Sequence, residues 1–147
     1  MTMRRLLVLL LLCLSCSYIM DRDPWDGARY KPLRFDGGTL MVSTGECSPV
    51  DFPVLIDWAN RAYRDMSAAQ PGFDFTIDQI YVYGQKLSTR HGYYDTKDKV
   101  IVFNCGEENV IRHELFHRYC YRWKMGCNCA TIDHPGGTPI GECKRWA

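Results

Sequence analysis

The sequence has very little net charge and no long hydrophobic run. Its 147 residues carry 18 Lys and Arg against 17 Asp and Glu, which gives a net charge of +1. A basic face that would attract nucleic acid is therefore not expected, and we predict no nucleic-acid partner. The longest apolar run, residues 6–12, is too short to cross a membrane. No internal repeat is visible, and the length suits one folded domain.

Residues 1–16 have the composition of a secretory signal peptide. Two arginines precede the apolar run, and small residues follow it. The end of this segment, Leu-Ser-Cys, is similar to the cleavage site of bacterial lipoproteins, in which the cysteine carries the lipid. Simple cleavage near Ser17 is the alternative. We therefore expect an exported protein, secreted, periplasmic or at the cell surface, whose only link to a membrane would be a lipid anchor at Cys16.

Cysteine is abundant, which agrees with export. Six cysteines lie outside the predicted leader, and an even number in an oxidising compartment favours three disulfides. Cys127 and Cys129 are too close in the chain to bridge each other easily, so each is expected to have a different partner. Such bridges would compensate for a modest core and tie the C-terminal segment to the preceding helix. The connectivity itself is not readable from the sequence.

The N-terminal third after the leader looks irregular. Residues 17–49 are rich in proline, glycine and charge, which predicts an extended linker or tether with at most a short strand at 39–43. The folded domain is expected at residues 50–147. Its first element is an amphipathic helix over 51–70, with Asp51 as the N-cap and an apolar stripe that packs in the core.

Alternation of apolar residues predicts a strand over residues 76–83 and a hairpin with arms at 92–95 and 99–104. The second arm is apolar on both faces and is expected inside the sheet, whereas the first arm would be an edge. A second helix is expected over 106–124, with Asn104 as its cap.

The most informative motif is His113-Glu114-Leu115-Phe116-His117. Residues four apart lie on one face of a helix, so the two imidazoles aim at a common point and Glu114 can reach a water bound there. Two neutral imidazoles suit zinc, and a zinc-bound water becomes a nucleophile near neutral pH. The pattern HExxH is the signature of zinc metallopeptidases, and the chain resembles the zincin superfamily.

The resemblance implies a small α+β domain, stapled by disulfides, in which a backing helix and a short twisted sheet with an edge hairpin pack on the HExxH helix. It implies Zn²⁺ as the cofactor and a metalloendopeptidase that hydrolyses a peptide or protein substrate as a monomer. In that activity Glu114 is the expected general base. Tyr93 and Tyr94 could line the substrate groove, or they could be ordinary strand residues. Tyr119 or Tyr121 could add a hydrogen-bond donor, but we expect both to pack against the sheet.

A catalytic zinc takes three protein ligands, so a third one must follow the helix. The metzincin continuation is absent, because Cys120 and Trp123 stand where it requires glycine and histidine. His134, Asp133 and Glu142 remain. We prefer His134, which lies in a turn that disulfides could hold near the helix. That choice is similar to SprT-like zincins, whereas Asp133 would be similar to aspzincins and Glu142 to gluzincins.

Two other classes of function remain open. One is a zincin-like binding module that turns nothing over, although such a module has no need of Glu114. The other is a structural zinc or disulfide module, in which Cys120 and either Cys127 or Cys129 would close a metal site without an open position.

Overall fold

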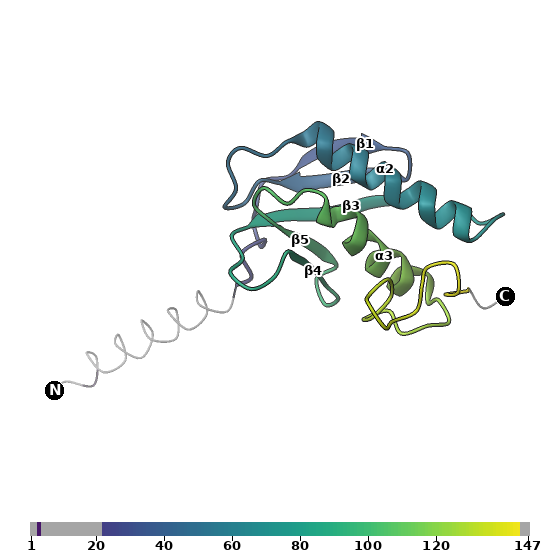
Figure 1. Cartoon of the computed structure of the whole chain (residues 1–147). Coiled ribbons are helices and arrows are strands. Elements are labelled where there is room, and N and C mark those ends of the chain that lie inside the picture. Colours follow the sequence, from purple (N-terminus) through teal and green to yellow (C-terminus); the bar gives the residue numbers. More distant parts are fainter. Residues whose placement is uncertain (1–2, 4–21, 145–147) are drawn as a thin grey trace.

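The computed structural model of the chain describes residue 3 and residues 22–144 (Figure 1). Cys16 and almost all of the predicted signal peptide lie outside the described residues. The fold is α+β, as predicted, with two helices and a mixed five-stranded sheet in the described part of the chain. No helix of that part is long and apolar enough to cross a membrane.

The sheet has the strand order β1-β2-β3-β5-β4. Antiparallel pairs form both ends of the sheet, and the three inner strands are parallel. The predicted hairpin is confirmed, with one arm at the edge of the sheet and the other inside it. The strands are β1 (Lys31–Phe35), β2 (Gly38–Ser43), β3 (Ile77–Gln85), β4 (Gly92–Asp95) and β5 (Val100–Asn104).

The two helices pack side by side on one face of the sheet (Figure 1). Helix α2 (Phe52–Ala69) connects the parallel strands β2 and β3. The Asp51 side chain accepts a hydrogen bond from the Val54 N–H at 3.2 Å, which confirms the predicted cap. The predicted apolar stripe is buried. It consists of Leu55, Ala59, Ala62 and Met66, together with Trp58, which is half-buried and packs against the core.

The short strand predicted at 39–43 is present as β2, but the prediction of a tether is wrong for residues 31–35, which form β1. Leu33 and Phe35 alternate with exposed residues and are buried in the core. The short connection Asp36-Gly37 is a turn signal between two such strands. Pro32 concealed the first strand, but proline is tolerated there because β1 is the edge of the sheet. The folded domain therefore begins before residue 50.

Residues 22–28 cover the other face of the sheet. Trp25 is buried there, with its ring against Tyr83 and Tyr93, at centroid distances of 6.3 and 6.5 Å. Its indole N–H donates to the Asp98 carboxylate at 2.9 Å. The chain is thus fixed to the domain from this tryptophan onward.

Helix α3 (Val110–Trp123) carries the HExxH motif and begins later than predicted. Asn104 does not cap it, because its side-chain oxygen accepts from the Leu87 N–H and its amide donates to Glu107. The sequence before Val110 forms tight turns. The helix ends at Lys124, which has a left-handed conformation.

Three disulfides are present, as predicted, and Cys127 and Cys129 have different partners. Cys47–Cys105 joins the segment after β2 to the end of β5. Cys120–Cys129 holds the segment of residues 124–144, which we call the tail, against the end of α3, and Cys127–Cys143 closes a loop within the tail. Ile132 and Met125 of the tail belong to the main core, so packing fixes the tail as well.

Candidate metal centre

Helix α3 presents His113 and His117 on one face, as the motif predicts. Their Nε2 atoms are 3.0 Å apart. The His117 side chain is largely buried, and its Nδ1 lies 2.6 Å from the carbonyl oxygen of Cys129 in the tail. The tail therefore fixes the orientation of the second imidazole of the motif.

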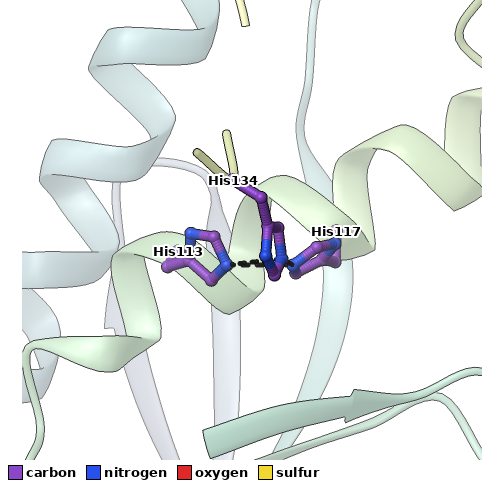
Figure 2. A group of neighbouring side chains, drawn as sticks. All are labelled: His113, His117 and His134. Atoms are coloured by element: carbon purple, nitrogen blue, oxygen red, sulfur yellow. Dashed lines mark hydrogen bonds between the residues drawn. The ribbon is translucent and has the colours of Figure 1, made fainter. Parts of the chain in front are cut away.

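The tail returns His134 to the same point. Its Nε2 is 3.1 Å from the Nε2 atoms of both His113 and His117, and Figure 2 shows the three rings converging. A tight turn holds the residue, because the His134 N–H donates to the Thr131 carbonyl and the Gly137 N–H donates to the His134 carbonyl. Glycine is required at position 137, since a Cβ there would collide with the Thr131 carbonyl oxygen.

The partners of the Nδ1 atoms determine which ring nitrogens carry protons. The Cys129 carbonyl can only accept, so Nδ1 of His117 is its proton donor. The Asp133 carboxylate, 3.4 Å from Nδ1 of His113, makes the same assignment for that ring. In a neutral imidazole the other nitrogen is then a bare acceptor. Two acceptor lone pairs 3.0 Å apart repel each other, and a cation between them removes this repulsion.

The electrostatics of the pair also favour neutral rings. Burial lowers the pKa of His113 and of His117 from the ordinary value, because it disfavours the charged imidazolium. For His113 the Asp133 carboxylate opposes this shift, and for His117 the hydrogen bond to Cys129 does. The neutral imidazole is the form that binds a metal ion.

The spacing of the three nitrogens fits a small divalent ion. Zinc binds imidazole nitrogen at about 2.0–2.1 Å, which places tetrahedral ligand nitrogens about 3.3 Å apart. The observed separations are 3.0–3.1 Å. His113, His117 and His134 therefore form a group that could hold a metal ion.

Glu114 lies one residue after the first histidine and is 4% exposed. Burial raises the pKa of its carboxyl group to about 7, because the charged form loses hydration. Glu114 lines the same groove as the three histidines. A carboxyl group with this pKa can exchange a proton near neutral pH, which is a property of general bases.

The groove has a volume of about 840 Å³ and lies between β4 and α3. Tyr93 and Tyr94 of β4 line it, as predicted, and Tyr121 of α3 faces Tyr94 with ring centroids 5.8 Å apart. Tyr121 is therefore placed to contact a ligand. Tyr119 is fully buried in the core, so it does not reach the groove.

Of the other candidates for the third ligand, Asp133 supports the site from outside the nitrogen triangle. Its carboxylate contacts His113 and also lies 4.0 Å from the guanidinium of Arg112. Arg112 in turn binds Asp65 of α2 at 2.8 Å. Among the described residues, Glu142 does not belong to the histidine group.

A second group of side chains that could ligate a metal consists of Cys120 at the end of α3 and of Cys127 and Cys143 in the tail, whose sulfur atoms lie within 4.8 Å of one another. These cysteines are paired as disulfides. His117 is part of the histidine group and not of this one.

No protein-family model matches the chain, and comparisons with curated proteins and with solved structures found no significant match.

Two contributors to the site were not found from the sequence. They are the Cys129 carbonyl and the Arg112 guanidinium. The Cys129 carbonyl carries no sequence signal, because its position depends on how the tail folds. Arg112 immediately precedes the motif, and its link to Asp133 could have been suspected only once the tail was known to return to α3.

Proposed function

We propose that this chain is a zinc-dependent metallopeptidase of the zincin type that acts on peptide or protein substrates. The observation that carries the proposal is the convergence of three imidazole Nε2 atoms, 3.0–3.1 Å apart, in a groove that Glu114 also lines. Three nitrogen ligands leave a zinc ion one position for water, which is the arrangement of catalytic rather than structural sites.

The residues of the groove have distinct roles in this proposal. His113, His117 and His134 would hold the zinc ion, which would supply a Lewis acid for the substrate carbonyl and for the attacking water. Glu114 takes a proton from that water as it attacks and delivers the proton to the leaving amine. Its raised pKa suits both steps, because the group can both accept and release a proton near neutral pH.

Strand β4 supports the choice of a peptide as substrate. It pairs only with β5, so one edge of β4 is unpaired within the described sheet, and this strand borders the groove. An extended peptide could add to that edge through main-chain hydrogen bonds. The aromatic rings of Tyr94 and Tyr121 would then contact its side chains.

Three disulfides support an oxidising compartment outside the cytoplasm. This agrees with export through the predicted signal peptide. The substrate would accordingly be an exported peptide or protein.

The first test measures the metal. Oxidised wild-type protein should bind one zinc ion per chain by elemental analysis, and His134→Ala should lose it. His91→Ala is the matched control, because His91 lies at the same groove but pairs with Glu107 at 2.6 Å and is not part of the histidine group. Wild-type protein that binds no stoichiometric metal would exclude the proposed enzyme.

The second test measures the chemistry. Glu114→Gln should keep the zinc ion and cleave a denatured protein substrate at least about 100-fold more slowly, which is the usual contribution of a general base. Equal rates for the variant and the wild-type protein would remove Glu114 from the mechanism.

One observation favours a structural zinc as the second candidate function. The same three histidines tie the tail to α3, which is what a structural ion does. Wild-type protein that binds zinc, gains stability from it and cleaves no peptide would favour this candidate.

A further inference from the structure

Four cysteines of the tail and the end of α3 form a sulfur cluster, which consists of Cys120, Cys127, Cys129 and Cys143. The sulfur atoms of Cys120, Cys127 and Cys143 lie within 4.8 Å of one another, and Cys129 joins the cluster through its disulfide to Cys120. The two disulfides within it are adjacent, because the sulfur atoms of Cys120 and Cys127, which belong to different disulfides, are 3.6 Å apart. By contrast, Cys47–Cys105 lies at the other end of the sheet strands and belongs to no such group.

This spacing is that of a thiolate metal site. Zinc binds thiolate sulfur at about 2.3 Å, so the sulfurs of a tetrahedral site stand about 3.8 Å apart. The Cys120–Cys127 separation already has nearly this value. Within each disulfide the two sulfurs are closer, and rotation of the cysteine side chains would separate them once the bond is broken.

The backbone that carries the cluster is held by hydrogen bonds that do not depend on the disulfides. The Gly126 N–H donates to the Lys144 carbonyl at 2.8 Å, which pairs the segments of Cys127 and Cys143. The Gln70 amide donates to the Cys143 carbonyl at 3.0 Å. These contacts would keep the sulfurs near one another after reduction.

Contacts other than the disulfides also hold the backbone of the remaining two cysteines. Cys120 lies in the last turn of α3, and its carbonyl accepts from the Met125 N–H at 3.1 Å. The Cys129 carbonyl is bound to the His117 ring. Cys120 and Cys143 are buried, whereas Cys127 and Cys129 are half-buried, so an ion could enter from the side of the latter pair.

We propose that these four cysteines form a redox-exchangeable metal site, with two disulfides when oxidised and a tetrathiolate site for a zinc-class divalent ion when reduced. Two molecules of a dithiol reductant each transfer two electrons and two protons to one disulfide and become cyclic disulfides themselves. The four thiols then lose four protons as the ion binds. The ion replaces the disulfides in holding the tail on α3.

This inference does not rest on the proposed peptidase function, and His134→Ala separates the two. That variant lacks a ligand of the histidine group and keeps all four cysteines. We expect oxidised His134→Ala protein to bind no Co²⁺, the spectroscopic substitute for zinc. After reduction by a dithiol, which is then removed under anaerobic conditions, it should bind one Co²⁺ per chain and show the intense thiolate-to-cobalt charge-transfer absorption of four sulfur ligands.

The control variants identify the sulfurs. In the His134→Ala background, Cys143→Ser should abolish the tetrathiolate spectrum, whereas the double variant Cys47→Ser/Cys105→Ser should keep it. Three results would overturn the proposal: a fully reduced chain without a thiolate-to-cobalt band, a band that Cys143→Ser leaves unchanged, or a reduced chain that unfolds and does not refold when Co²⁺ is added.

Discussion

Replacement of the buried carboxyl group of Glu114 by an amide should change how the stability of the metal-free protein depends on pH. The pKa of this group is about 7 in the folded chain, against an ordinary value of 4.5. At a pH between these two pKa values, the Glu114 carboxyl group holds a proton in the folded state and has released it in the unfolded state. The unfolding free energy of the wild-type protein therefore loses a contribution as the pH rises through this window. Gln cannot titrate, so Glu114→Gln should not show this loss.

The size of the effect follows from the shift. At about 1.4 kcal/mol per pKa unit, the gap between 4.5 and about 7 corresponds to about 3 kcal/mol. Relative to the wild-type protein, Glu114→Gln should gain this amount in unfolding free energy between about pH 4 and about pH 8. The shifted histidines contribute to both proteins alike, so their effect cancels in the difference.

Urea unfolding of chelator-treated protein at several pH values measures this difference. Glu108→Gln is the control for the removal of one acidic side chain, because Glu108 does not line the groove. Parallel pH profiles for wild-type protein and Glu114→Gln would refute the reasoning. They would mean that the Glu114 carboxyl group is hydrated in the folded protein, so that burial does not raise its pKa.

The other predictions concern the support of the site and the disulfide outside the tail. Asp133→Asn should weaken zinc binding about 10–100-fold, because a ligating imidazole loses its carboxylate acceptor; a competition titration with a chromophoric chelator measures this, and unchanged affinity would contradict it. Gly137→Ala should lower the unfolding free energy by about 1–3 kcal/mol, because the added Cβ collides with the Thr131 carbonyl oxygen. Gly141→Ala is the control, since open space surrounds that position. Equal denaturation midpoints for the two variants would argue against this turn. Cys47→Ser/Cys105→Ser opens a loop with a sequence separation of 58 and should lower the unfolding free energy by about 4 kcal/mol, while zinc binding persists. Thermal unfolding measures the loss of stability, and elemental analysis measures the bound zinc.

The sequence was sufficient to predict the local elements that have a strong period or cap. The helix after Asp51 and the hairpin before α3 have clear apolar patterns, and both are present. The two histidines of the motif share one face because helix geometry alone requires it. His134 could be named only as one of three candidates, because its approach depends on how the tail folds.

What the sequence did not predict depends on long-range contacts. Residues 31–35 resemble a linker when their charges and proline are read alone, and they form a strand because Leu33 and Phe35 pack in the core. Helix α3 begins later than predicted because the Asn104 side chain accepts a hydrogen bond from the Leu87 N–H instead of capping the helix. In both cases a tertiary partner outweighed a local preference.

The burial of Trp25 on the sheet limits how far the proposed enzyme could lie from a membrane. If Cys16 carries lipid as predicted, eight residues separate it from Trp25. The nine steps along the chain reach on the order of 30 Å at full extension. Tyr93, whose ring Trp25 contacts, also borders the groove. The folded domain would then stay within a thin layer above the bilayer, and it could cleave only substrates that reach this layer.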